Sequence, residues 1–204
     1  AIGIFKDQVA VDAYPHWAGA RPGDIIFKDV NGDNVIDGND RVRNDKSRTP
    51  RFTGGLNVDL GYKDFDLSFL LQGAMGGVFY QTTESGDFAN FLKSFYDNRW
   101  TEENPDADFP RTYNRSNEYF INQQNTFWLH KTDYIRLKNI ELGYTVPSIW
   151  SKKIGVEHLR VYINAYNLLT ISPDMKDYDP ENTSGSGYNY PLNKVINFGV
   201  NLTF

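Results

Sequence analysis

The 204-residue chain has no cysteine and only three histidines, His16, His130 and His158, which lie far apart in the sequence. The absence of cysteine excludes disulfide bonds and thiolate metal sites. The chain also lacks a nucleophile elbow, a phosphate-binding glycine loop and a zinc motif. We therefore expect no enzymatic activity, although the many acidic residues leave a glycosidase with two paired carboxylates as a disfavoured alternative.

Long hydrophobic runs and basic blocks are absent as well. No stretch approaches the ~20 apolar residues that a transmembrane helix requires, so we do not expect a helical membrane protein. The net charge is -5 and lysines and arginines form no block, which argues against a nucleic-acid partner and against a polybasic patch for anionic lipid. Aromatic residues are plentiful, at 15% of the chain, which is typical of β-rich proteins.

Residues 193–204 alternate between apolar and mostly polar side chains. Because the side chains of a β-strand point alternately to its two faces, this segment predicts a strand with one apolar face. A strand of a soluble β-sandwich would show the same pattern, with its polar face toward water. We favour a strand of an outer-membrane β-barrel, because the pattern recurs upstream at a length that crosses a bilayer. The pattern ends on the aromatic Phe204, which we interpret as a barrel terminal signal.

Similar alternation predicts four further strands upstream. Two of them form a hairpin around Lys63-Asp64, and their lengths match the ~9–11 residues of a tilted barrel strand. In the third, the apolar side chains change from odd to even positions between Leu137 and Ile140, which indicates a β-bulge or a strand that rises above the membrane. The five predicted strands span residues 52–62, 65–73, 133–146, 158–168 and 193–204.

The connections between these strands alternate between short turns and long loops, at 74–132 and 169–192. Outer-membrane barrels show this pattern, with the long loops outside the cell, and we assign residues 1–51 to that side as well. The predicted fold class is therefore all-β, with residues 52–204 forming the C-terminal strands of a large antiparallel transmembrane β-barrel. Five strands cannot close a barrel, and the chain starts without Met or a signal peptide. We expect it to be a piece of a larger protein whose other strands lie upstream.

Residues 29–40 carry oxygen side chains at the spacing of a calcium-binding loop. A calcium ion takes about six to eight oxygen ligands, and side chains at alternate loop positions point toward one centre. Ile36 supplies the aliphatic anchor of such a loop, whereas Asn34 replaces the turn glycine. We predict a Ca²⁺ site; a surface loop of Asx-turns that needs no metal is the alternative. The predicted ligands are Asp29, Asn31, Asp33, the Val35 carbonyl, Asp37 and Asp40.

Aromatic residues of the long loop at 74–132 are candidates for stacking on a sugar ring, or for packing within the loop itself. Residues 87–100 place apolar side chains at helical spacing, which favours a small core of the loop. The stacking candidates are Tyr80, Phe95, Tyr96 and Trp100. Polar residues expected to face the barrel interior are Asp59, Asp66, Arg136, Lys138, Arg160 and Asn164. Candidates for interfacial aromatic girdles are Trp100, Trp128, Trp150, Tyr134, Tyr144 and Tyr166.

A series of segments occurs in an order that resembles one known family. The segments are Gly3–Phe5, Val11–Tyr14, Ala20–Phe27, the calcium-like loop, Thr49–Phe52, Gly54–Leu56, Asp133–Asn139, Asn164–Leu168 and the terminal strand. Together they resemble the C-terminal part of SusC/RagA-type TonB-dependent transporters of Bacteroidota, over essentially the whole chain.

This resemblance implies a barrel of about 22 strands with an N-terminal plug, in the bacterial outer membrane. The whole protein would import oligosaccharides or peptides together with a SusD-like surface lipoprotein. TonB would drive the import through an N-terminal region that has no counterpart in these residues. The alternative is a secreted, calcium-stabilised β-sandwich that binds glycans, which would be soluble without detergent and would fold on its own.

Overall fold

The structure, a computed structural model, describes residues 1–82, 91–113, 119–181 and 192–204. Within these residues the chain forms two compact units. The first unit contains residues 1–46 and 79–130, and the second contains residues 47–78 and the described residues from 131 onward.

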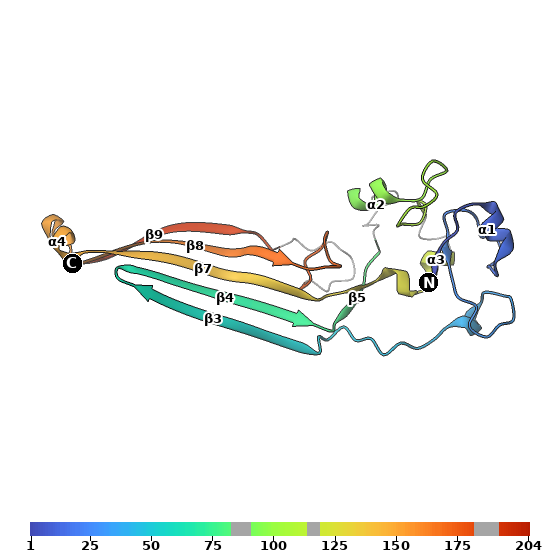
Figure 1. Ribbon diagram of the computed structural model, residues 1–204, viewed down its shortest axis with the longest axis horizontal. Coiled ribbons are helices and arrows are strands. Elements are labelled where there is room, and N and C mark those ends of the chain that lie inside the picture. The colour runs from blue at the N-terminus through green and yellow to red at the C-terminus, as the bar shows by residue number, and fades with distance from the viewer. Residues whose placement is uncertain (83–90, 114–118, 182–191) are drawn as a thin grey trace. The chain divides into compact units, whose positions relative to one another are not determined.

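The second unit is one antiparallel sheet of five long strands (Figure 1). The strands neighbour one another in the order β3-β4-β7-β8-β9. Their bounds are β3 Phe52–Tyr62, β4 Phe65–Met75, β7 Tyr134–Val146, β8 His158–Ile171 and β9 Val195–Thr203. The prediction of an all-β, antiparallel fold is confirmed, although β4 and β8 extend further than predicted and β9 is shorter.

The pairing register aligns apolar residues across the whole sheet. Leu60 of β3 lies opposite Leu67 of β4, which lies opposite Leu142 of β7. Ile163 of β8 and Phe198 of β9 continue this row. Because every second residue of a strand returns to the same face, the neighbouring rows follow the same rule. One face of the sheet is therefore apolar from edge to edge.

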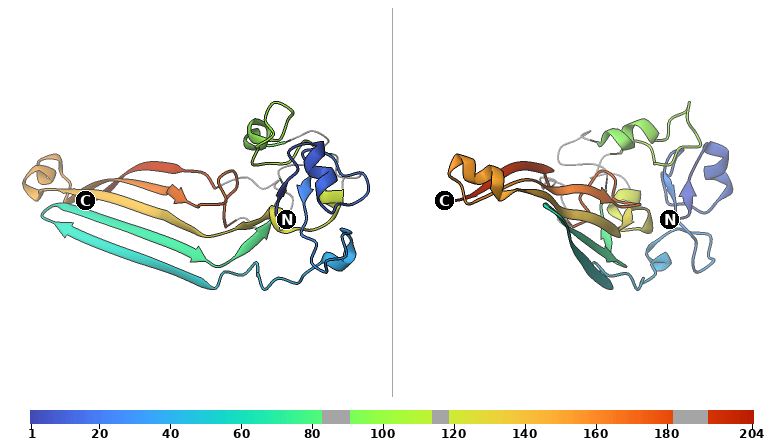
Figure 2. Two further views of the ribbon diagram at one scale, coloured as in Figure 1. Left: turned by 45° about the vertical axis from the view of Figure 1, so that its right-hand side comes forward. Right: turned by 60° about the vertical axis from the view of Figure 1, so that its left-hand side comes forward.

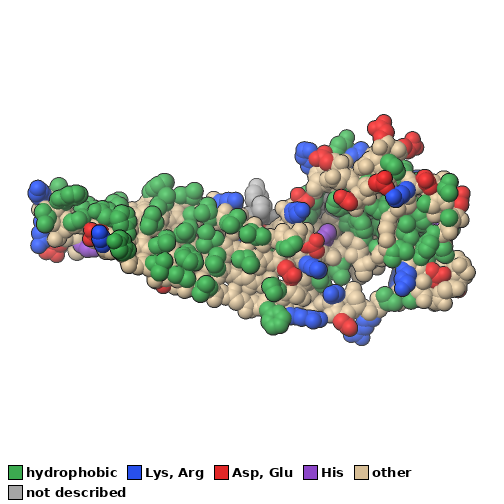
Figure 3. Space-filling view, viewed as in Figure 1, with side chains coloured by type: hydrophobic (Ala, Val, Ile, Leu, Met, Phe, Trp, Pro, Cys, Tyr) green, Lys and Arg blue, Asp and Glu red, His purple; other side chains and the backbone are tan. Residues whose placement is uncertain are grey.

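The apolar face is exposed rather than packed against another layer. Leu60 is 57% exposed and Phe198 is 81% exposed, far above the values of core residues. Figure 3 shows hydrophobic side chains over the middle of the sheet, with few charged side chains among them. An exposed apolar area that crosses five strands exceeds what the surface of a soluble monomer normally carries.

A β-bulge in β7 keeps this face continuous. Leu137 pairs with Leu71 of β4, and Asn139 pairs with the next β4 residue, Leu70, so Lys138 is the extra residue. The pairing with β8 is shifted at the same place, beside Asn167, which has a positive φ of 52°. Asparagine tolerates this left-handed conformation better than most residues. The predicted bulge is confirmed, and it explains why odd positions before it and even positions after it share one face.

The strands of the sheet are joined at one end by short connections. A two-residue turn joins β3 to β4, with Lys63 at a positive φ of 54°, as predicted for a tight hairpin. The connection from β7 to β8 contains the helix α4 (Ser148–Ser151) and the 3₁₀ helix η3 (Lys152–Ile154). Among the described residues, the helices are all too short and too polar to cross a membrane.

The first unit consists of short elements around an aromatic core. Tyr113 lies at its centre, with ring centroids 5.9 Å from Phe95, 5.7 Å from Phe120 and 5.9 Å from Trp128. Most of these contacts are edge-to-face, the geometry that aromatic rings favour. The elements are β1 (Gly3–Ile4), α1 (Gln8–Ala13), β2 (Ile25–Ile26), η1 (Gly38–Asp40), α2 (Lys93–Asn98), α3 (Tyr119–Asn122) and η2 (Thr126–Trp128). A further strand pair is formed by β5 (Val78–Tyr80) and β6 (Leu129–Lys131).

The core draws on two distant parts of the sequence. Trp17, Ile25 and Ile36 come from the N-terminal segment and pack with Phe95 and Trp128 from the predicted loop at 74–132. The sequence predicted a small core of that loop alone, so the contribution of the N-terminal segment was missed. Helical spacing predicted a helix within residues 87–100; α2 covers the later part of this range, and residues 87–90 lie outside the described residues.

We expect Phe95→Ala to lower the free energy of unfolding of the first unit by about 3–5 kcal/mol, because the ring is fully buried and truncation leaves a cavity. The adjacent Tyr96 is 59% exposed, so Tyr96→Ala is the matched control and should change stability by less than about 1 kcal/mol. Hydrogen exchange of residues 1–46 and 91–130 measures both effects. Equal exchange in the two variants would contradict this core assignment.

Candidate functional site

The face of the sheet opposite the apolar rows carries a hydrogen-bonded polar network. Arg160 of β8 donates from Nε to Asp66 Oδ1 at 3.0 Å and from Nη2 to Glu141 Oε1 at 2.8 Å. Asn164 Nδ2 donates to Glu141 Oε2 at 3.3 Å, and Asn197 Nδ2 donates to Asn164 Oδ1 at 2.9 Å. The network therefore links β4, β7, β8 and β9 in one chain of contacts.

Gly143 makes room for the contact between Arg160 and Asp66, which crosses β7. Asp66 and Arg160 lie on strands that are separated by β7. Gly143 of β7 pairs with Asp66 and with Tyr162, and the Arg160 side chain passes over Gly143 to reach Asp66. A Cβ at Gly143 would overlap the Arg160 guanidinium and lie 2.5 Å from Asp66 Oδ1. A larger residue would thus displace the ion pair, which explains the need for glycine at this position.

A second polar cluster surrounds Arg136, whose side chain is only 1% exposed. Arg136 donates from Nε to Thr170 Oγ1 at 2.9 Å and forms ion pairs with Asp179, at 2.8 Å, and with Glu181. A buried guanidinium is costly unless its donors are satisfied, and these acceptors satisfy it. The cluster thereby holds the segment that follows β8 against the polar face of the sheet.

Glu181 accepts hydrogen bonds from several strand residues. Tyr134 Oη donates to its Oε1 at 2.7 Å, Gln72 Nε2 donates to the same oxygen at 3.0 Å, and Lys138 Nζ lies 3.1 Å from Oε2. Burial alone would raise the pKa of Glu181, but the hydrogen bonds from Tyr134 and Lys138 and the charge of Arg136 outweigh it and hold the pKa below its ordinary value.

The segment at 172–181 has further attachments to the same unit. Ser172 Oγ donates to the Asp133 carbonyl at 2.8 Å, and Asp174 Oδ2 accepts from the Lys131 amide at 2.8 Å. Met175 is buried, at 5% exposure. The sequence predicted a long loop at 169–192; in the structure β8 continues to Ile171, and the described part of the loop lies on the polar face instead of extending freely.

The six residues predicted to face the barrel interior all lie on the polar side of the sheet. Asp66, Arg160 and Asn164 belong to the first network, and Arg136 and Lys138 belong to the cluster around Glu181. Asp59 lies opposite Ser68, in the row that continues to Glu141 and Asn164. Sequence alternation placed these side chains on one face, but it gave no signal for Asp179 and Glu181, which lie outside the strands.

The predicted calcium loop is closed by its own hydrogen bonds. Asp29 accepts from the amides of Gly32, at 2.7 Å, and Asn34, at 2.9 Å. Asp40 accepts from the amides of Val30, at 2.8 Å, and Asp37, at 2.9 Å; these bonds lower the pKa of Asp40. Within the described residues, no three acidic or histidine side chains gather closely enough to hold a metal ion. The arrangement of these oxygens is that of Asx-turns.

The loop is nevertheless fixed to the first unit. Ile36 is 4% exposed and belongs to the aromatic core, so the predicted aliphatic anchor is in place. Asn34 adopts a positive φ of 63°, the conformation that a glycine would otherwise supply. Asn31, Asp33 and Val35 are exposed, and Asp37 is half-buried. The donor chemistry fits a hard cation, since every predicted ligand atom is oxygen.

The four stacking candidates are not equally available to a ligand. Phe95 is fully buried between Phe91, Tyr113 and Phe109, so it serves the core of the first unit. Tyr80 is half-buried and packs against the same core.

The two other stacking candidates lie nearer the surface. The Trp100 ring packs against Gly23, where a Cβ would lie 2.6 Å from Cε3, and its Nε1 donates to the Lys6 carbonyl at 3.0 Å. Tyr96 is the most exposed of the four, and the Arg99 guanidinium lies 3.9 Å from its ring centroid.

The residues predicted to form interfacial aromatic girdles also differ in where they lie. Tyr144 lies on the apolar face and packs against Phe65, with ring centroids 4.7 Å apart, in the row that includes Tyr62. The prediction is wrong for Trp128, which is fully buried in the first unit, and for Tyr134 and Tyr166, which lie on the polar face of the sheet. Tyr166 shares its face of β8 with Arg160 and Asn164, and Tyr134 shares its face of β7 with Arg136.

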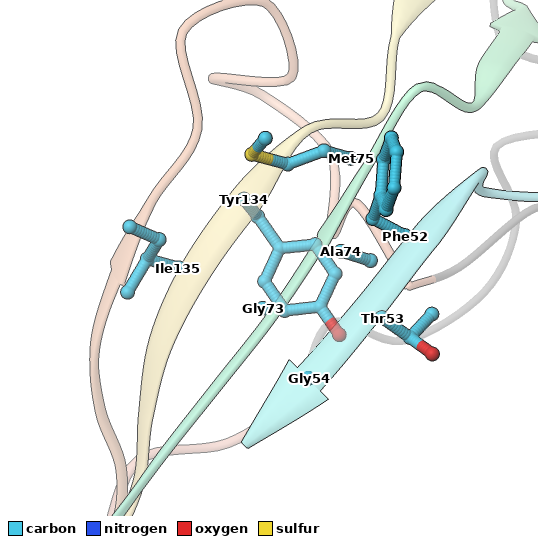
Figure 4. Close-up of a pocket in the computed structure, with 8 residues that line it drawn as sticks. All are labelled: Phe52, Thr53, Gly54, Gly73, Ala74, Met75, Tyr134 and Ile135. Carbon is cyan, nitrogen blue, oxygen red and sulfur yellow. The ribbon is translucent and has the colours of Figure 1, made fainter. Parts of the chain in front are cut away.

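One cavity, of about 260 Å³, lies at the end of the sheet near the start of β3 (Figure 4). It is lined by Phe52, Thr53, Gly54, Gly73, Ala74, Met75, Tyr134 and Ile135. Gly54 and Gly73 pair with each other and carry no side chains that could fill this space. No charged side chain lines the cavity, so it offers no group that would orient a polar ligand.

We expect the attachment of residues 172–181 to weaken in acid. Because the pKa of Glu181 is lowered by folding, its contribution is complete above the ordinary value of 4.5 and is lost as the pH falls through the lower folded value. Hydrogen exchange of this segment between pH 7 and pH about 3 measures the loss. Glu181→Gln should exchange faster at neutral pH and lose most of the acid dependence, whereas the exposed Glu157→Gln should match the parent. An unchanged pH profile in Glu181→Gln would contradict the assignment.

No family model matches the sequence. The TonB-dependent receptor P3 of Formosa agariphila is 32% identical over 90% of this chain and 19% of that protein. The TonB-dependent receptor SusC of Bacteroides thetaiotaomicron is 29% identical over 90% of this chain and 18% of that protein. The solved structure of the RagAB peptide importer in the open-open state is similar with a TM-score of 0.63 and 30% identity, over 84% of this chain and 19% of that chain. The chain thus spans about a fifth of the length of these relatives.

Proposed function

Because the chain belongs to the SusC/RagA family of TonB-dependent receptors, we propose that its sheet forms part of the wall of an outer-membrane β-barrel that imports nutrients. The observation that carries this proposal is the sheet with one exposed apolar face and one hydrogen-bonded polar face. Lipid would cover the apolar rows, and the polar networks would line the barrel interior.

The height of the apolar face supports a membrane location. β3 advances about ten residues from Phe52 to Tyr62, or ~33 Å at ~3.3 Å per residue. At a strand tilt of ~40° this length spans ~25 Å, the height of the apolar band of outer-membrane barrels. Phe52 and Tyr62 are 71% and 70% exposed, so aromatic rings lie at both ends of the band.

The outer edges of β3 and β9 have no partner strand among the described residues. Unpaired backbone amides and carbonyls are not tolerated in hydrocarbon, so further strands must pair with both edges. We propose that these strands belong to the same barrel and that the chain contributes its C-terminal part.

We further propose that the whole protein imports oligosaccharides or peptides with a SusD-like surface lipoprotein, with energy supplied through TonB. The support is the similarity to SusC and to the RagAB peptide importer. Transport, not catalysis, is the activity that this sheet serves. A β-sandwich that binds glycans is less well supported, because the other sheets of the described residues are two-stranded and the apolar face stays exposed.

Calcium would stabilise the first unit in this proposal. The loop at 29–40 is joined to the aromatic core through Ile36, so an ion that orders the loop would also protect the core. The ligands would be Asp29, Asn31, Asp33, the Val35 carbonyl, Asp37 and Asp40. To reach one ion, these side chains would have to turn from their present Asx-turn hydrogen bonds toward a common centre.

We expect Asp33→Asn to weaken calcium binding by about tenfold, because it removes one ligand charge without a change of shape. Asp45→Asn, an exposed acid outside the loop, is the matched control. Terbium luminescence measures binding directly, since Tyr14 Oη lies 3.5 Å from the Asp29 amide and can transfer energy to a bound ion. Equal binding by both variants, or no binding by the parent, would contradict the site.

The membrane proposal is tested by two adjacent substitutions in β4. Phe69→Arg should impair insertion by about 2–4 kcal/mol, because Phe69 lies in a row near the middle of the apolar face. Ser68→Arg should be tolerated, since Ser68 points to the polar face between Asp59 and Glu141. Folding of the full-length receptor into phospholipid bilayers gives both values. If both variants insert equally well, the apolar face does not meet lipid.

A further inference from the structure

The connection between β7 and β8 exposes three large apolar side chains within a few residues. Ile149 is 73% exposed, Trp150 is 62% exposed and Ile154 is 68% exposed. Lys152 and Lys153 are exposed between them. A connection that met only water would gain nothing from this much uncovered apolar surface.

The backbone of this connection is held in a fixed turn. Ser151 and Val156 are buried, at 1% and 5% exposure, and the Val156 amide donates to the Ser151 carbonyl at 3.1 Å. Gly155 ends η3 at a positive φ of 76°, and its amide donates to the Lys152 carbonyl at 3.1 Å. The exposed side chains thus belong to an ordered turn that is attached to the end of the sheet.

The connection continues the apolar face of the sheet. Val146, Leu159 and Leu202 form the last apolar row of β7, β8 and β9, and α4 begins two residues after Val146. Both views in Figure 2 show α4 beyond the ends of these strands, close to the C-terminus. The three exposed side chains therefore lie just past the edge of the band that lipid would cover.

We propose that α4 and η3 anchor this end of the barrel in the lipid interface. Ile149, Trp150 and Ile154 enter the boundary between headgroups and acyl chains, and Lys152 and Lys153 contact lipid phosphates. This inference rests on the proposed membrane location of the sheet. Lipid is the occupant because the last apolar row of the sheet, Val146, Leu159 and Leu202, lies next to this turn.

The chemistry of each side chain suits that boundary. An indole ring is favoured at the level of the headgroups, where its apolar body and polar N–H both find partners. Lysine stems lie along apolar surface while the ammonium groups reach water or phosphate. Two lysines are too few for a polybasic patch, so the apolar side chains carry the contact and the lysines orient it.

The test uses the full-length receptor in phospholipid vesicles, with one environment-sensitive fluorophore on a single cysteine. The described sequence has no cysteine of its own, and cysteines elsewhere in the receptor are replaced by serine. Three sites are labelled in turn through Trp150→Cys, Phe198→Cys and Tyr96→Cys. Nitroxides at shallow and deep acyl positions report contact with lipid, and iodide reports contact with water.

The label at 150 should be quenched more by shallow than by deep nitroxides, with iodide quenching about fivefold below that of the label at 96. Ile149→Ser with Ile154→Ser should restore iodide quenching at 150. The label at 198 should be quenched by deep nitroxides. If the label at 198 meets lipid while the label at 150 is as open to iodide as the label at 96, the anchor is refuted and the barrel proposal stands.

Two other results would also overturn the anchor. Shielding of the label at 150 from both iodide and nitroxides would mean that protein covers the turn. A label at 198 that no lipid nitroxide reaches would remove the proposed membrane location itself, and the anchor with it.

Discussion

The structure depends on one constraint, the alternation of side chains along each strand held in register across five strands. A shift of one residue between any two strands would move a whole apolar set to the polar face. The bulge at Lys138 shows how strictly the register is kept, because the extra residue restores the phase that the sequence of β7 would otherwise lose. The exposed apolar rows and the polar networks both follow from this arrangement.

On the polar face, stability depends on the pairing of charged side chains. Its charged residues are satisfied by one another at short range, through Arg160 with Asp66 and Glu141, and through Arg136 with Asp179 and Glu181. Each network also restrains structure, since the first ties four strands together and the second attaches the segment after β8. In the proposed barrel, an inner wall built in this way would offer few unsatisfied charges to a substrate. Under that proposal, substrate selectivity would come from surfaces outside this sheet.

Much of the sheet was predictable from the sequence, because strand alternation is a local signal. The hairpin at Lys63-Asp64 and the phase change in β7 could be read from neighbouring residues alone. The aromatic core of the first unit could not, since Trp17 and Ile36 meet Phe95 only through a long-range contact that no periodicity encodes. The same holds for Glu181, whose partners lie on two strands. The prediction for Trp128 was wrong because the local sequence around an aromatic residue does not distinguish an interfacial girdle from a buried core.

The most direct test is a cysteine scan along β9, from Val195 to Thr203, in the full-length receptor in outer membranes. A water-soluble maleimide should label the odd positions, which share a face with Asn197 and Asn201, and spare Ile196, Phe198, Val200 and Leu202. The reverse pattern should hold for quenching by lipid nitroxides. Labelling that rises and falls with a period of two would establish a wall between lipid and water. Equal labelling at odd and even positions would contradict it.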